Sequence, residues 1–236
     1  MKRTLGQWMT SLIFPMRCCL CGEVVAWSEH LCARCRQEAP YILPPVCERC
    51  GCHEDDCTCG GHHRHFARCV APFRREGVVQ DAINRLKKDS WATDTRGLAV
   101  EMAEVLRREY GGIAFDVVTD VPTHKKEYRR RGHNDAEQLA RAISSLIRVP
   151  YYPLLRKIIH TRPQKELNAL ERTGNLLGAF DVIDEDRVKG KTVLLVDDVI
   201  TTGSTLDECA KMLKIYDAAE VYVVTVAAVV LPKQKK

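Results

Sequence analysis

Hydrophobic residues recur at two different spacings along the 236-residue chain, and each spacing predicts its own kind of element. Apolar positions three and four apart predict helices in "REGVVQDAINRLKKD", "TRGLAVEMAEVLRREYGG", "AEQLARAISSLI", "LNALERTGNLL" and "STLDECAKMLKIY", the last beginning at Ser204. Short, nearly continuous apolar runs predict strands in "FDVVTDVP", "AFDVI", "KTVLLVDD" and "EVYVVTVAAVV". Because strands alternate with helices, the predicted fold class is α/β, a mostly parallel sheet covered by helices on both faces.

The first part of the chain has a different composition. Residues 1–66 are rich in cysteine, proline and histidine and show little regular apolar period, whereas residues 67–236 have an ordinary composition. We therefore predict two domains, a small module over 1–66 and the α/β domain over 67–236.

Ten of the twelve cysteines lie between Cys18 and Cys59, in a pattern typical of zinc ribbons. Cys18-x-x-Cys21 and Cys32-x-x-Cys35 match two knuckles that present four thiolates to one zinc ion, and four protein ligands leave no open position for catalysis. We predict a structural zinc site there, which would stabilise a segment too small to be held together by burial alone.

A second, less regular cysteine set begins with Cys47-x-x-Cys50. The residues that compete for its two remaining ligand positions are Cys52, Cys57 and Cys59, with His53, His62, His63 and His65 nearby. We choose Cys57 and Cys59, and interpret the histidines as a solvated loop rather than as ligands. The two sets together predict a double zinc ribbon with one or two structural zinc ions, and Cys19, Cys52, Cys69 and Cys209 are expected to be small packed thiols.

The termini and the charge restrict the protein class only mildly. "MKRTLGQWMTSLIFPMR" has a basic start, but its apolar stretch is interrupted by polar residues, so we expect no cleaved signal. No run approaches the roughly 20 apolar residues of a membrane span. With reduced, metal-bound thiols, these features predict a soluble cytoplasmic protein without membrane insertion. The net charge of +5 permits anionic ligands without requiring nucleic acid.

The segment "VLLVDDVITTGST", residues 193–205, carries the strongest candidate chemistry. Asp197 and Asp198 follow a buried strand, where open α/β sheets place ligands. The next residues offer hydroxyls, backbone N–H groups and a helix N-terminus to an anion, and they are Thr201, Thr202, Gly203, Ser204 and Thr205. A ribose 5-phosphate satisfies both parts, since its phosphate would sit in the turn while its hydroxyls donate to the carboxylates. The alternative is a helix-capping turn with Ser204 as the cap.

A strongly basic segment follows another predicted strand. In "VPTHKKEYRRRGHNDAEQLA" we expect a charged loop whose cations could neutralise a pyrophosphate leaving group, namely Lys125, Lys126, Arg129, Arg130 and Arg131. The alternative is a solvated or nucleic-acid-contacting face. Tyr41, Phe66 and Tyr128 are candidate stacking platforms for bases, although such residues more often pack internally. Lys87, at a helix end, could reach the ligand, but the helix dipole also explains it.

The segment from Val193 to Thr205 resembles the phosphoribosyltransferase signature, the loop that holds phosphoribosyl pyrophosphate (PRPP) in the type I fold. The resemblance implies that Asp197 and Asp198 hold the ribose hydroxyls, that residues 201–205 hold the 5-phosphate, and that Mg²⁺ bridges pyrophosphate and ribose oxygens. Thr201 stands where purine-salvage members carry an aspartate that handles the proton of the base. Threonine cannot act as that acid or base, so the sequence argues against hypoxanthine or guanine salvage.

Together with the cysteine pairs, "VPTHKKEYRRRGHNDAEQLA" and "ERTGNLLGAF", this signature makes nearly the whole chain similar to the competence protein ComF family, including its GntX relatives. One departure is that His133 and Asp135 stand where the family usually has phenylalanine and glutamine. The resemblance implies a zinc ribbon fused to a phosphoribosyltransferase domain that serves DNA uptake in natural transformation. The partners that it implies are single-stranded DNA and proteins of the DNA-uptake machinery.

Three functions follow as hypotheses. The first is a PRPP-binding competence factor that handles single-stranded DNA. The second is an active Mg²⁺-dependent phosphoribosyltransferase that acts on an unidentified nitrogen nucleophile and releases pyrophosphate. The third, a scaffold without a ligand, is disfavoured because Asp197, Asp198 and Gly203 are intact.

Overall fold

The computed structural model of the protein describes residues 15–60, 63–88, 92–123, 125–158 and 179–231. The helix predicted in "LNALERTGNLL" lies outside these residues. The helical elements are α2 (Ala33–Glu38), the 3-10 helix η1 (Glu54–Asp56), α3 (Gly77–Leu86), α4 (Ala92–Tyr110), α5 (Lys125–Arg131), α6 (Asp135–Ile147) and α8 (Ser204–Ile215). The strands are β1 (Arg68–Val70), β2 (Phe73–Arg74), β3 (Val117–Asp120), β4 (Leu155–Lys157), β5 (Phe180–Val182), β6 (Thr192–Ile200) and β7 (Glu220–Ala228).

Within the described residues, the main sheet is parallel and has five strands. Its order is β1-β7-β6-β3, and β2 pairs with a later part of β7. The central pair, β6 and β7, is in register from Thr192 opposite Glu220 to Ile200 opposite Ala228. Their nearly continuous apolar sequences are those of strands buried on both faces, so the α/β prediction is confirmed.

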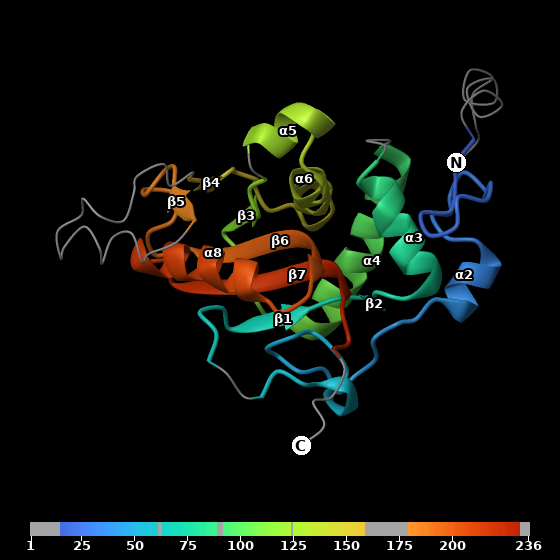
Figure 1. The fold of residues 1–236 in the computed structure, drawn as a ribbon, viewed down its shortest axis with the longest axis horizontal. Helices are drawn as coiled ribbons and strands as arrows, with labels where there is room; N and C mark the ends of the chain where they lie inside the picture. The colour runs from blue at the N-terminus through green and yellow to red at the C-terminus, as the bar shows by residue number, and fades with distance from the viewer. Residues whose placement is uncertain (1–14, 61–62, 89–91, 124, 159–178, 232–236) are drawn as a thin grey trace.

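Alternate residues of β6 supply two separate hydrophobic cores, one on each face of the sheet (Figure 1). Leu194 and Val196 belong to the core that α3, α4 and α6 cover. Val193 and Leu195 belong to the core that α8 covers, which also contains residues of the small antiparallel sheet of β4 and β5. The helices therefore lie on both faces, as the alternation of elements predicted.

The first cysteine cluster packs against α3 and α4. Arg85 of α3 donates to the backbone oxygens of Cys19 and Leu20 at 3.2 and 2.9 Å. His30 and Glu101 of α4 are 2.7 Å apart. Contact with α4 is close enough that a Cβ atom on Gly97 would lie 2.5 Å from Cβ of Cys19.

The second cysteine cluster lies on the other side, beneath β1 in Figure 1. Ile42, Cys52 and Phe66 from this part of the chain are buried in the core that α8 covers. The module pairs with the sheet through Tyr41, which forms an antiparallel bridge with Phe73 of β2, and the N–H of Ala67 donates to Val221 at 2.8 Å. Ala67 lies next to the division that we predict between residues 66 and 67, and the division itself stays a prediction.

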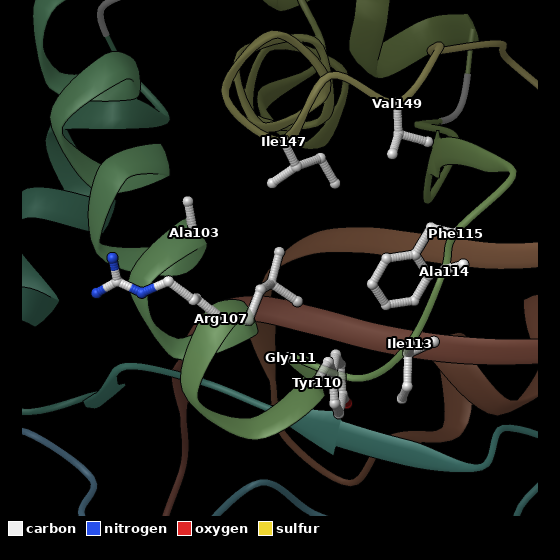
Figure 2. A pocket seen from close by; sticks show the side chains of 10 residues that line it. Ala103, Arg107, Tyr110, Gly111, Ile113, Ala114, Phe115, Ile147 and Val149 are labelled. Carbon is white, nitrogen blue, oxygen red and sulfur yellow. The ribbon is translucent and has the colours of Figure 1, made fainter.

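An apolar pocket of about 380 Å³ lies between the C-terminal ends of α4 and α6 (Figure 2). Tyr110, Ile113 and Phe115 line it together with Ile147 and Val149. Because Ile113 and Phe115 precede β3, the pocket belongs to the edge of the sheet at which the strands begin. No helix in the described parts of the chain is both long and apolar enough to cross a membrane.

Candidate ligand site at the ends of β3 and β6

The two adjacent acids occupy the last part of β6, but the strand does not end at them. It continues to Ile200, because Val199 and Ile200 still pair with Ala227 and Ala228 of β7. Successive side chains of a strand point to opposite faces. Asp198 therefore shares the face of Val196 and lies on the side of α3 and α6, whereas Asp197 lies on the side of α8.

Lys87 joins α3 to the acidic pair. Its Nζ lies 2.7 Å from Oδ2 of Asp198, and the exposed fractions of the two side chains are 34% and 15%. The backbone N–H of Asp198 donates to Oδ1 of Asp197 at 2.8 Å. Burial and the charge of Asp198 hold the pKa of Asp197 well above its usual range, and Lys87 acts in the opposite direction. Lys87 therefore contacts the acidic pair directly. Its place at the end of a helix, which the helix dipole explains, did not predict this contact.

His133 and Asp135, the two departures from the family pattern, contact each other. Nε2 of His133 lies 3.0 Å from Oδ1 of Asp135, and both side chains are buried. Arg131 lies 3.4 Å from the second oxygen of Asp135. Burial raises the pKa of Asp135, against the opposing effect of His133. The histidine and the acid therefore replace the aromatic residue and the amide as a matched polar pair at the start of α6.

The turn after β6 has the conformation that an anion site requires. Gly203 has a φ of +77° and is the N-cap of α8, which begins at Ser204 as predicted. Thr202 and Ser204 share a hydroxyl hydrogen bond of 2.9 Å. The side chains of Thr201, Thr202, Ser204 and Thr205 are exposed. Hydroxyls and free N–H groups at the start of a helix form a ready site for phosphate.

A pocket of about 430 Å³ begins at the end of β3, the strand that pairs with β6. Asp120, opposite Val196 in the sheet register, accepts hydrogen bonds of 2.7 Å from Asn134 and from the hydroxyl of Tyr151. Burial raises the pKa of Asp120, although the bond from Tyr151 acts in the opposite direction. Sequence reasoning missed Asp120, but an acid at the end of a buried strand before a proline was a usable signal.

The basic segment forms α5, a helix, where the sequence predicted a charged loop. Lysine, arginine and glutamate favour helix, and an i,i+4 ion pair between Glu127 and Arg131 of 3.3 Å supports it. Arg129 lines the pocket beside Asp120. Arg131 faces Glu127 and Asp135 instead, so it is partly neutralised. The side chains of Lys125, Lys126 and Arg130 lie outside the described part of the structure.

The three candidate stacking platforms differ in exposure. Phe66 is buried in the core, so it cannot stack on a base. Tyr41 packs on Phe73, with ring centroids 4.9 Å apart. Tyr128 is 46% exposed and lines the pocket at the end of β3. Of the three, Tyr128 has the position that a base-stacking residue needs.

The eight predicted zinc ligands form two clusters of four. Cys18, Cys21, Cys32 and Cys35 form one, and Cys47, Cys50, Cys57 and Cys59 form the other, with the sulfur atoms of each cluster within 4.8 Å of one another. Several sulfur pairs are 3.7 Å apart. Zn–S bonds of about 2.3 Å place tetrahedral thiolates about 3.8 Å apart, so both clusters fit one zinc ion each.

The cysteines outside the clusters behave as packed thiols. Cys19, Cys52, Cys69 and Cys209 are buried. Cys52, which competed for the second site, instead contacts the backbone oxygen of Val229 at 3.7 Å. Among the described histidines, none joins either cluster.

Arg64 and His65, which follow the second cluster in the sequence, contact the turn and helix α8. The sequence did not predict these contacts. Arg64 donates to the backbone oxygen of Thr202 at 2.5 Å. The backbone N–H of His65 donates to Oδ1 of Asp207 at 2.7 Å. The histidine-rich segment is therefore not only a solvated loop.

Comparisons with known proteins define the class of both modules. The phosphoribosyl transferase domain family matches residues 98–235, and the double zinc ribbon domain family matches residues 9–71. The α/β domain thus has the type I phosphoribosyltransferase fold, and the N-terminal module is a double zinc ribbon with structural zinc.

Similar proteins extend over both modules. Competence protein F of Haemophilus influenzae is 34% identical over 221 residues, which cover 89% of this chain and 96% of that protein. DNA utilization protein YhgH of Escherichia coli K12 is 29% identical over 230 residues, covering 94% and 92%. Competence protein ComFC of Streptococcus pneumoniae is 27% identical over 230 residues, covering 87% and 97%. The chain belongs to the ComF family, as its motifs predicted.

Proposed function

We propose that this protein binds PRPP at the β6–α8 turn and acts in DNA uptake, where it handles single-stranded DNA in the cytoplasm. The observation that carries the PRPP assignment is the acidic pair of β6 followed by Gly203, in the left-handed conformation, at the start of α8. The role in DNA uptake is supported by relatives named competence protein F, ComFC and DNA utilization protein YhgH.

The end of β6 and the turn that follows it suit the two ends of a ribose 5-phosphate. Asp197 and Asp198 would accept hydrogen bonds from the ribose hydroxyls. The 5-phosphate would take the N–H groups and hydroxyls of residues 201–205. The distance that the sugar ring puts between its hydroxyls and its phosphate keeps the phosphate away from the carboxylates.

The pyrophosphate of PRPP would extend toward the basic residues at the end of β3. Arg129 borders this pocket, and Arg131, Lys125, Lys126 and Arg130 belong to the same helix, α5. Mg²⁺, held with the ligand beside Asp197 and Asp198, would supply positive charge that offsets the charge of the pyrophosphate.

The same pocket supports the contact with single-stranded DNA. Tyr128 offers an exposed ring, and Arg129, Arg156 and Lys157 line the pocket around it. Aromatic stacking combined with cations that follow the phosphates is the usual mode of sequence-tolerant single-strand binding. Arg156 is paired with Asp181 at 2.5 Å, so Arg129 and Lys157 would contribute most of the attraction.

The second candidate function is an active phosphoribosyltransferase, and the pocket beside Asp120 is the observation that favours it. A nitrogen nucleophile seated there would lie next to the acidic pair, on the neighbouring strand. Thr201 offers no acid or base, so a buried acid such as Asp120 would have to handle its proton.

One set of measurements tests both functions. Isothermal titration calorimetry with PRPP and Mg²⁺ should detect binding that Asp197→Asn with Asp198→Asn weakens, without loss of the fold or of zinc. Unaltered affinity in this variant would contradict the ribose assignment. A pyrophosphate-release assay with a panel of nitrogen nucleophiles distinguishes a transferase, which must release pyrophosphate, from a protein that only binds PRPP.

A titration with single-stranded DNA at several salt concentrations tests the proposed contact with DNA. Affinity should fall as salt rises, and Tyr128→Ala should weaken it by roughly 1–3 kcal/mol if the ring stacks on a base. The exposed Trp27 on the first ribbon gives a matched aromatic control. Equal losses in both variants would contradict a specific role for the pocket.

A further inference from the structure

The phosphate-binding turn is in contact with a residue that precedes the α/β domain in the sequence. Nη2 of Arg64 donates to the backbone oxygen of Thr202 at 2.5 Å, although the two residues are 138 positions apart. A Cβ atom on Gly203 would lie 3.2 Å from Nη2 and 3.3 Å from Cζ of Arg64. The guanidinium group therefore lies directly against the turn.

The next residue secures the start of the helix that follows the turn. The backbone N–H of His65 donates to Oδ1 of Asp207 at 2.7 Å, and Nδ1 of its ring lies 3.2 Å from the same oxygen. Asp207 lies in the first turn of α8. Arg64 and His65 together thus contact the turn and the first turn of its helix.

The guanidinium group has more donors than the turn uses. One nitrogen bonds Thr202, while Nε is buried and makes no hydrogen bond with the described residues. An arginine side chain has five N–H donors and stays charged at all ordinary pH values. Its positive charge lies beside a turn whose hydroxyl-bearing residues Thr201, Thr202 and Ser204 are exposed.

The second cysteine cluster precedes this segment in the sequence, and its neighbour Glu48 bonds to the strand that follows the segment. Cys59 of that cluster is five positions before Arg64. On the other side of Arg64, the N–H of Cys69 in β1 donates to the backbone oxygen of Glu48 at 2.7 Å, and Glu48 directly follows Cys47. The described segment that carries Arg64 therefore lies between a ribbon whose residue Glu48 contacts β1 and a sheet that Ala67 joins.

We propose that Arg64 is a positioning residue for the phosphate-binding turn, that its charge favours the 5-phosphate, and that zinc in the second cluster keeps it in place. This inference rests on the proposed PRPP function and adds to it a residue from the zinc ribbon. It predicts that the metal site and the sugar-phosphate site are energetically coupled, because loss of the metal would release the segment that carries Arg64.

Arg64→Ala is the direct test, with Arg49→Ala as the matched control. Arg49 is an exposed arginine of the same ribbon and lines one pocket with Arg64, so its variant removes the same charge nearby but keeps the bond from Arg64 to Thr202. Arg64→Ala should weaken both PRPP and ribose 5-phosphate about tenfold or more in calorimetry, since both carry the 5-phosphate and charge-assisted hydrogen bonds are the strong ones. Arg64→Lys, which keeps the charge, should recover part of the loss.

Hydrogen exchange in the free protein gives a second readout. The amides of residues 202–206 should exchange faster in Arg64→Ala than in the wild type or in Arg49→Ala, because the turn loses its contact. Cys57→Ser should produce the same two changes together with the loss of one zinc ion, whereas Cys32→Ser should not change the exchange of this turn.

Affinity and exchange in Arg64→Ala that equal those of Arg49→Ala would overturn the inference. If the wild type bound neither PRPP nor ribose 5-phosphate, the proposed function would fail instead. Exchange of residues 202–206 would then still decide whether Arg64 positions the turn.

Discussion

The ammonium group of Lys87, just after the last residue of α3, lies 2.7 Å from a carboxylate oxygen of Asp198 in β6. Two adjacent carboxylates repel each other, and the cation offsets part of that repulsion. The same end of α3 contacts the first zinc ribbon, because Arg85 donates to the backbone oxygens of Cys19 and Leu20. The acidic pair is therefore connected to the N-terminal module through one helix end.

Lys87→Gln should weaken PRPP binding, by roughly tenfold at neutral pH if the lost interaction is worth about 1.4 kcal/mol. Without the cation, the pKa of Asp197 rises further and this carboxyl group is protonated more of the time. The loss should shrink as the pH rises, because Asp197 then ionises again. Calorimetry from pH 6 to pH 9 would check this, with the exposed neighbour Lys88→Gln as the control. A deficit that does not vary with pH would contradict it.

The stability of Asp197→Asn, measured relative to that of the wild type, should increase as the pH rises. The pKa of Asp197 is raised in the folded state, so the folded protein holds its proton at pH values where the unfolded chain has lost it. The wild type therefore loses stability as the pH rises from about 4 through the raised pKa, with each unit of elevation worth about 1.4 kcal/mol. Asparagine does not titrate and avoids this loss.

Urea unfolding of both proteins at about pH 5 and pH 8 would measure this effect as the difference in the free energy of unfolding. Both proteins contain the same zinc clusters, so the pH dependence of metal binding cancels in the comparison. Asp186→Asn, at an exposed acid, should show no such trend. A difference that stays constant between the two pH values would show that the pKa of Asp197 is not raised.

Gly203→Ala should weaken PRPP binding strongly, whereas Gly190→Ala should not. Both glycines have positive φ, +77° and +70°, so each substitution should cost about 1–2 kcal/mol of stability. A Cβ atom at Gly190 meets open space, but at Gly203 it would lie 3.2 Å from Nη2 of Arg64, in the turn that we propose to bind the phosphate. Thermal unfolding should show similar losses of stability for both variants. Calorimetry should show weaker PRPP binding for Gly203→Ala only. Equal affinities would show that no ligand approaches this turn.

Elemental analysis should find about two zinc ions per chain, one for each cluster of four thiols. Cys57→Ser should reduce the content to about one ion, because it removes a ligand of the second cluster only. Cys52→Ser should leave it at two, since Cys52 lies outside the cluster. A content near one zinc ion per wild-type chain would contradict the second zinc site.

The sequence predicted the features that depend on local pattern. Apolar spacing located β6, β7 and α8, and Ser204 begins its helix where the turn residues indicated. The choice of Cys57 and Cys59 for the second cluster agrees with the structure, which places Cys52 elsewhere. These features are set by residues close together in the chain, so their spacing is informative.

Contacts between distant segments were not predictable in this way. Nothing near Arg64 indicates that it meets Thr202, and Lys87 had a sufficient local explanation at its helix end. The helix α5 was missed because its charges indicated solvation, while helix propensity and the ion pair of Glu127 with Arg131 favoured helix. The partnership of His133 with Asp135 likewise required the folded geometry.

The zinc ribbons supply buried side chains to both cores of the sheet, Leu20 and Leu31 on one face and Ile42 and Phe66 on the other. A fragment that began at residue 67 would expose the apolar surfaces that these side chains cover, and such surfaces promote aggregation. The two modules therefore have to be produced as one polypeptide, and a truncated transferase domain would be a poor substitute for the whole chain in any assay of the ligand.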